Sequence, residues 1–161
     1  MDDSATFDSL VGGLEYPMFI VTARAGEERL GCLVGFATQT SIDPPRFLVC
    51  ISDKNLTYRV ARTAEAMAVH LVPADRTDLA ELFGGETGDD ADKFSAAEWR
   101  RGPDGVPVIT ACPTWFAGTI LDRIPLGDHV GFLLHPYGGN DMNDDPLGFQ
   151  RARRIDPGHE A

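Results

Sequence analysis

The sequence predicts a small, mainly β domain in which short strands form a barrel with a few added helices. Short apolar runs recur along the chain, and most are bounded by Gly, Pro, Asp or Asn. Consecutive runs are not regularly separated by long helices, which counts against a doubly wound parallel sheet. The length of 161 residues fits one domain with a proper core. No GxGxxG follows a strand, so a Rossmann cofactor site is not supported.

Six runs are predicted to be strands, because each is short, apolar or β-branched, and bounded by turn residues. The first two are joined by the turn AGEE and are expected to pair across it. Pro44 and Pro45 end the second strand, since proline donates no backbone N–H. The six predicted strands are residues 18–24, 30–38, 47–52, 67–72, 114–121 and 129–135.

Two helices are predicted from capping residues. The side chain of Asn55 can accept a hydrogen bond from the first turn of a helix over 56–65. Asp75 can cap a second helix over 76–83 in the same way. The segment 84–105 is expected to be mainly loop. The predicted strands and helices place one domain over 1–136. The segment 137–161 is expected to be an extended C-terminal tail.

Composition narrows the class of protein. The net charge of −11 argues against nucleic acid as a partner, since phosphate backbones attract basic surfaces. No apolar run reaches the length of a membrane span, and the acidic N-terminus does not resemble a signal peptide. A cytoplasmic protein without a membrane segment is therefore expected. Three widely spaced cysteines argue against a disulfide framework, and the absence of CxxC or HxxxH patterns argues against a metal site.

One predicted helix start has the chemistry of a phosphate site. In FLVCISDKNLTYRVA, residues 47–61, a strand ends at Ser52 and a helix begins after Asn55. The free N–H groups and the positive dipole end of such a helix bind phosphate. Ser52, Asn55 and Thr57 would add hydrogen bonds, and Lys54 and Arg59 would add charge. The alternative is an ordinary capped helix with solvated charges.

Two further places are candidates for ligand contact. His129 follows Asp128 at the start of the sixth strand, where a carboxylate can orient the imidazole for proton transfer or amide binding. The alternative is a structural histidine at a strand end. Lys93, next to Phe94, is one of only two lysines. The alternative for Lys93 is a surface ion pair.

The order of several short motifs resembles the flavin reductase family, over roughly residues 14–136. No single motif is specific, but the ordered set at these spacings is hard to obtain by chance. The motifs are YP (16–17), IVTA (20–23), G…TSIDPP (31–45), FLVCIS…T (47–57), DKF (92–94), Trp99, Pro107 and GDH (127–129). The resemblance implies a six-stranded antiparallel Greek-key split barrel with peripheral helices, and a homodimer.

The resemblance also implies a cofactor, a co-substrate and a reaction. FMN, or FAD in its place, would lie along the second strand near the subunit interface. NADH or NADPH would stack on the flavin and transfer hydride to it, with His129 near the nicotinamide as the catalytic residue. The reduced flavin could then serve a partner monooxygenase. The implied cofactor-binding residues are Tyr16, Pro17, Cys32, Leu33, Val34, Gly35, Thr38, Gln39, Thr40, Ser52, Asn55, Thr57, Lys93 and Phe94.

The opening of residues 31–45, GCLVGFATQTSIDPP, departs from the family pattern. Leu33 stands where a threonine is usual, and Gly35 and Phe36 replace serines. Backbone contacts to a flavin need no hydroxyl group, so flavin binding tolerates this change better than a specific activity does. Two alternatives therefore stay open. One is a flavin-binding or electron-transfer protein without reductase turnover, and the other is a split barrel that binds a different cofactor.

Overall fold

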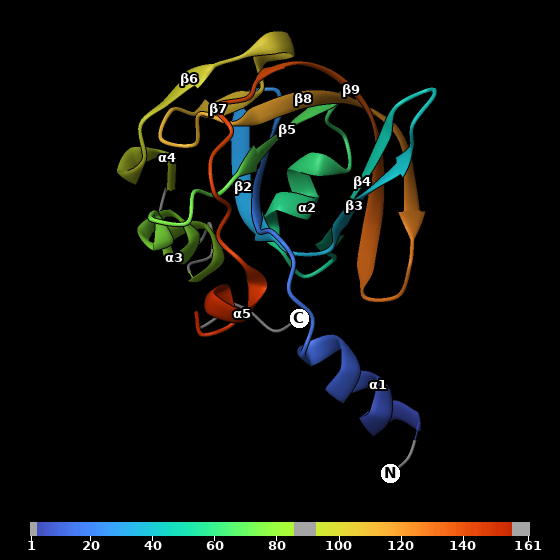
Figure 1. Cartoon of the computed structure of the whole chain (residues 1–161). Helices are drawn as coiled ribbons and strands as arrows, with labels where there is room; N and C mark the ends of the chain where they lie inside the picture. Colours follow the sequence, from blue (N-terminus) through green and yellow to red (C-terminus); the bar gives the residue numbers. More distant parts are fainter. Residues whose placement is uncertain (1–2, 86–92, 156–161) are drawn as a thin grey trace.

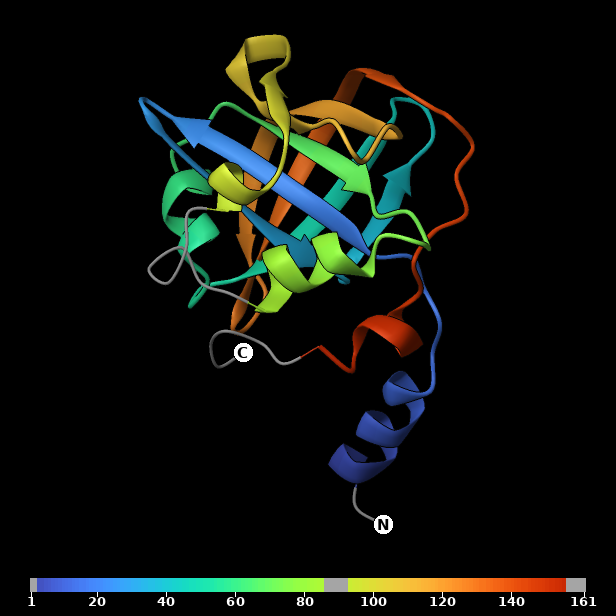
Figure 2. The same cartoon turned by 90° about the vertical axis from the view of Figure 1, so that its left-hand side faces the viewer.

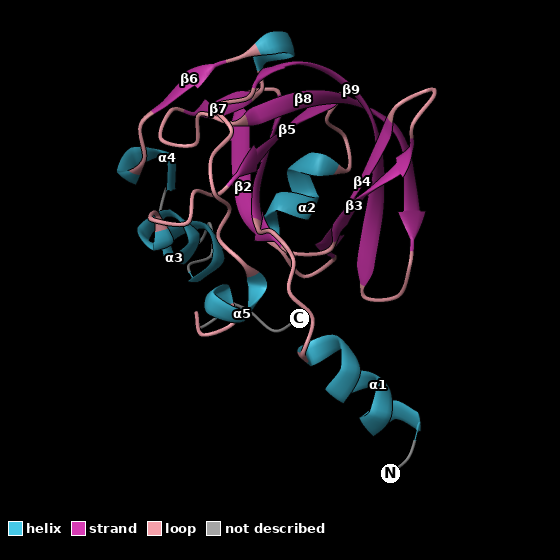
Figure 3. Ribbon diagram, in the orientation of Figure 1, coloured by secondary structure: helices cyan, strands magenta, loops and turns pink. Residues whose placement is uncertain are grey.

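The structure is a computed structural model, and it describes residues 3–85 and 93–155. Strands dominate it, as Figures 1 and 3 show. The strands are β1 (Phe19–Ala25), β2 (Glu28–Val34), β3 (Ala37–Ser41), β4 (Arg46–Ser52), β5 (Ala66–Leu71), β6 (Trp99–Arg101), β7 (Pro107–Ile109), β8 (Trp115–Pro125) and β9 (His129–Asn140). The helices are α1 (Asp3–Gly12), α2 (Leu56–Ala61), α3 (Thr77–Gly85), α4 (Lys93–Ala96), the 3-10 turn η1 (Pro103–Gly105) and α5 (Phe149–Ala152).

The main sheet is antiparallel and contains seven strands in the order β2-β1-β5-β8-β9-β4-β3. The prediction of a mainly β, antiparallel fold is confirmed, whereas the prediction of six strands is wrong. The predicted strand 30–38 divides at Gly35 and Phe36 into β2 and β3, which lie at opposite edges of the sheet. Within the described residues no ladder joins these two edges, so the predicted closure of the barrel is not found.

The other predicted strands and both helices are found, although α2 ends at Ala61 and β8 and β9 continue to Pro125 and Asn140. β1 and β2 pair across the expected turn, with Ala25 opposite Glu28. Asn55 caps α2, because its Oδ1 accepts a hydrogen bond from the N–H of Thr57 at 2.8 Å. The segment 84–105, predicted as mainly loop, carries α4, β6 and η1, and β6 pairs with β7 just beyond it, while residues 86–92 lie outside the described part. The helix α1 was not predicted.

Helix α2 lies on the concave side of the curved main sheet (Figure 1). Its buried Val60 and Ala61 belong to an apolar cluster with residues from both ends of the sheet, including Val21, Cys32 and Val49. Burial of apolar side chains from β1, β2, β4 and β9 against one short helix holds the curved sheet together. This packing places the start of α2 beside β2 and β4, where the candidate site lies.

A second apolar cluster lies on the other side of β1 and β2. It contains Ile20, Phe83 of α3 and Leu147 from the C-terminal segment, all buried. The predicted tail thus begins as a continuation of β9 to Asn140 and later packs Leu147 and Ala152 into this cluster.

Helix α1 projects from the body of the molecule in both views (Figures 1 and 2). Its last carbonyl group is held by the C-terminal segment, because Gln150 Nε2 and Arg153 Nη1 donate to the carbonyl of Gly12 at 2.9 and 2.7 Å. None of the described helices has the length and apolar character that crossing a membrane requires.

Candidate functional site

Many of the predicted site residues gather around one pocket of about 190 Å³, where β2, β4, β9 and the start of α2 meet. It is lined by Tyr16, Met18, Cys32, Leu33, Val34, Gly35, Phe36, Cys50, Ile51, Ser52, Asn55, His129 and Phe149. A larger hollow lies elsewhere, between β1, β5, β8 and residues 138–144, and contains none of the predicted residues. The smaller pocket is therefore the candidate site.

The break between β2 and β3 shapes one wall of this pocket. At Gly35 the chain passes so closely over Tyr16 that an added Cβ would lie 2.9 Å from the tyrosine Cε2. Such a contact is shorter than real Cβ atoms make, so only glycine fits here without a shift. The backbone of Phe36 is then fixed on β4, where its carbonyl accepts the N–H of Cys50 at 2.9 Å. The wall is thus mostly backbone and apolar side chain.

Two pairs of aromatic rings line the pocket. Tyr16 and Phe149 are stacked, with ring centroids 4.6 Å apart and planes 13° from parallel. Phe36 and His129 form the second pair, with centroids 5.0 Å apart. Flat, largely apolar surfaces of this kind suit a planar ring ligand, because aromatic rings bind one another by stacking.

His129 is oriented as the sequence predicted. It starts β9 opposite Ser52 of β4, and its Nδ1 lies 2.7 Å from Oδ1 of Asp128. The hydrogen bond with His129 is the main reason why the pKa of the exposed Asp128 carboxyl lies below its ordinary value. A carboxylate on Nδ1 fixes the ring and leaves Nε2 as the nitrogen available to a ligand.

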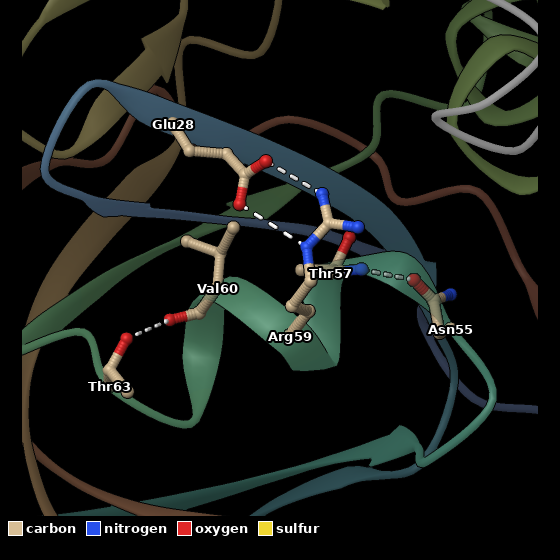
Figure 4. Close-up of polar contacts among 6 residues, drawn as sticks. All are labelled: Glu28, Asn55, Thr57, Arg59, Val60 and Thr63. Atoms are coloured by element: carbon tan, nitrogen blue, oxygen red, sulfur yellow. Dashed lines mark hydrogen bonds and ion pairs between the residues drawn. The ribbon is translucent and has the colours of Figure 1, made fainter.

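The polar end of the pocket lies at the turn before α2. Ser52 Oγ accepts the N–H of Lys54 at 3.3 Å, and the N–H of Asn55 donates to the Ser52 carbonyl at 3.0 Å. Arg59, expected to add charge here, pairs instead with Glu28 of β2 at 2.6 Å (Figure 4). Ser52 and Asn55 are therefore the predicted phosphate-site residues that reach the pocket.

Thr57 and Lys93 do not line the pocket. Both are buried, and Lys93 Nζ donates to the carbonyl groups of Phe83 at 2.9 Å and Gly31 at 3.4 Å. Burial raises the pKa of the adjacent Cys32 thiol to about 11, while its hydrogen bond with Thr57 and the charge of Lys93 act in the opposite direction. Thr57 and Lys93 therefore act on the pocket through Cys32, which lines it.

The remaining predicted residues are distributed around the pocket. Phe94 is buried between the rings of Phe83 and Trp99, away from the pocket lining. Pro17 is exposed next to Tyr16. Thr38, Gln39 and Thr40 are exposed on β3 and continue the chain directly from the pocket wall, outside the lining itself.

Sequence reasoning missed five lining residues: Met18, Phe36, Cys50, Ile51 and Phe149. Alternation along β4 was a usable signal for Cys50, which lies two residues from Ser52 and so on the same face. Phe149 carried no such signal, because it reaches the pocket from a segment more than a hundred residues away from most of the other lining residues.

The chain belongs to the flavin reductase like domain family, because the model of that family matches residues 11–156. Among curated relatives, the stachydrine N-demethylase reductase subunit Stc3 of Rhizobium meliloti is 32% identical over 85% of this chain and 60% of its own length. The NADH-dependent FMN reductase RutF of Klebsiella pneumoniae is 27% identical, over 84% of this chain and 82% of its own.

Solved structures agree with the fold. The NADH:FAD oxidoreductase SgcE6 of Streptomyces globisporus superimposes with a TM-score of 0.83, at 21% identity, over 94% of this chain and 90% of its own. Several curated relatives are longer proteins, since the chain spans only 44 to 61% of three of them.

Proposed function

We propose that the protein is a flavin reductase that binds FMN in this pocket and oxidises NADH or NADPH. The observation that carries the proposal is the pocket itself. Backbone and apolar side chains form the wall at Leu33–Gly35, aromatic rings lie at its sides, and His129 stands at the rim. This arrangement, in a chain of the flavin reductase like family, supports a planar ring ligand.

The residues present fit FMN in two parts. A volume of about 190 Å³ lies below the usual range for a whole cofactor and suits a ring system alone. The sugar-like chain and phosphate would then extend over the exposed Thr38, Gln39 and Thr40, with Ser52 and Asn55 at the polar end. The relatives include both FMN and FAD reductases by name, so FAD is the second candidate.

When bound, the flavin would supply the hydride-accepting chemistry. The protein's own work is to align rings and exclude water, which makes orientation the main catalytic contribution. Gly35 lets the backbone approach closely, Tyr16 and Phe149 flank the ring ligand, and Asp128 holds His129 toward the co-substrate. In this proposal His129 orients the amide group of the nicotinamide.

The test is the visible spectrum of purified protein with FMN, taken before and after NADH without oxygen. We expect a flavin spectrum that bleaches, followed by continuous NADH oxidation when air is admitted. Failure to bind FMN or FAD in excess would contradict the proposal.

A second candidate function follows from the wall residues Leu33 and Phe36, which replace hydroxyl side chains usual in the family. A protein with this wall could bind flavin without reductase turnover, as a carrier or electron-transfer module. The same experiment separates the two functions, because such a protein would take up FMN but would not bleach with NADH or NADPH.

Three broader features remain part of this proposal. A homodimer would complete a ligand site whose own pocket holds only a ring. A partner monooxygenase is suggested by Stc3, which is named as the reductase subunit of a demethylase. A cytoplasmic location would give the enzyme access to reduced nicotinamide.

A further inference from the structure

Phe36 occupies an unusual position in the break between β2 and β3. The close approach of Gly35 to Tyr16 and Met18 leaves no room for a side chain on that side. The next side chain therefore turns outward, and Phe36 is 57% exposed although its backbone is hydrogen-bonded to β4. Its ring lines the pocket beside His129.

His129 is held by contacts of two kinds. Asp128 binds Nδ1 at 2.7 Å, which fixes one edge of the imidazole. The ring of Phe36 lies with its centroid 5.0 Å from that of the imidazole, at an interplanar angle of 50°. Asp128 and Phe36 thus contact the imidazole at different places, one at Nδ1 and the other through its ring.

Part of the Phe36 surface is accessible in the pocket, because the residue is 57% exposed and belongs to the lining. A nicotinamide whose amide reaches His129 would bring its own ring beside Phe36, because the two side chains are in contact. Stacking between aromatic rings stabilises such a complex beyond the burial of area. A serine or threonine at this position would offer no such surface.

We propose that Phe36 is a positioning and specificity-determining residue, which holds the plane of His129 and forms the wall on which the nicotinamide ring of the co-substrate packs. This inference rests on the proposed reductase function. It concerns how the co-substrate is bound and not whether flavin is bound.

The test compares Phe36→Leu, which keeps apolar bulk, with Phe36→Tyr, which keeps the ring. Ile42→Ala is the matched control, because Ile42 is 85% exposed on the turn after β3 and outside the pocket. With Phe36→Leu we expect KM for NADH to rise about 3- to 10-fold. We expect kcat and the Kd for FMN to stay within about twofold, since a change in KM alone marks binding shared by ground and transition states.

A second readout does not depend on turnover. In protein without flavin, the proton NMR signals of the His129 ring, assigned with His129→Gln among the four histidines, should shift when the Phe36 ring is removed. Phe36→Tyr should restore both the signals and KM, and Ile42→Ala should change neither.

Three results would overturn the inference. The first is an unchanged KM with Phe36→Leu in an otherwise active enzyme, and this result leaves the proposed function intact. The second is a higher Kd for FMN with an unchanged KM for NADH, which would mean that Phe36 stacks on the flavin. The third is wild-type protein that binds no flavin, which removes the proposed function and this inference together.

Discussion

His129 is fixed by the carboxylate that precedes it in the chain and by a ring from the break between two strands. We predict that His129→Ala lowers kcat/KM for NADH by about tenfold, the effect of losing one good hydrogen bond to the co-substrate. The Kd for FMN should change much less. Steady-state kinetics and flavin fluorescence measure the two quantities. Equal losses in both would mean that His129 contacts the flavin.

His70 is a buried histidine that holds two backbone groups together. Its Nδ1 lies 2.9 Å from the Ile20 carbonyl, and its Nε2 accepts the N–H of Ile109 at 3.0 Å. These two bonds require the neutral ring, and burial lowers its pKa to about 4.

The stability of the fold should therefore depend on pH through His70. Between pH 6.5 and 4 the unfolded chain binds a proton that the folded chain excludes, so stability falls as the pH falls. We predict a loss of about 2 kcal/mol in the free energy of unfolding between pH 7.5 and 5 from this group. Urea unfolding of wild type and His70→Gln at both pH values isolates the contribution of His70, because glutamine does not titrate. An identical pH dependence in the two proteins would contradict the assignment.

Among the elements, α2 connects local sequence most directly to the site. Its start was predictable because capping needs only a side-chain oxygen two residues before a free N–H, and Asn55 provides one. The split of 30–38 into β2 and β3 was not predictable in this way. It depends on the space left by Tyr16 beside Gly35, a contact across the fold that no local pattern contains.

We predict that Asn55→Ala lowers the free energy of unfolding by about 1 kcal/mol, whereas Asn55→Ser does not. Serine keeps the acceptor for the N–H of Thr57, and alanine removes it. Urea unfolding of the three proteins measures the difference. If serine and alanine destabilise the protein equally, the amide of Asn55 has a role other than capping.

At the scale of the whole molecule, the site combines residues that lie far apart in the sequence. The proposed site residues of segment 32–35, with Ser52, Asn55 and His129, line one pocket in the structure. The last three could be proposed from sequence because Ser52 ends a strand, Asn55 caps a helix and His129 begins a strand. The family resemblance also implied Lys93 as a ligand residue, yet the structure buries Lys93 against the carbonyl groups of Phe83 and Gly31. Which way a lysine points depends on tertiary packing and not on its neighbours in the chain.

The C-terminal segment is the part of the molecule that sequence patterns described least. Leu147 is buried, and its backbone bonds in both directions: its N–H donates to the Val72 carbonyl at 2.8 Å, and its carbonyl accepts the N–H of Met18 at 2.9 Å. The segment thus bridges the chain entering β1 and the chain leaving β5, which also bond to each other, since the N–H of Val72 donates to the Met18 carbonyl at 3.1 Å. This bridge lies two residues before Phe149, which stacks on Tyr16.

We therefore predict that Leu147→Ala costs about 2–5 kcal/mol in the free energy of unfolding, as expected for a cavity in a packed core. Met142→Ala, at a 59% exposed position in the same segment, should change it by less than about 0.5 kcal/mol. Denaturant unfolding measures both, and the Kd for FMN should rise in Leu147→Ala because Phe149 loses its support. If both variants are as stable as wild type, residues beyond β9 are an appendage of the domain, and Phe149 reaches the pocket without energetic coupling to the core.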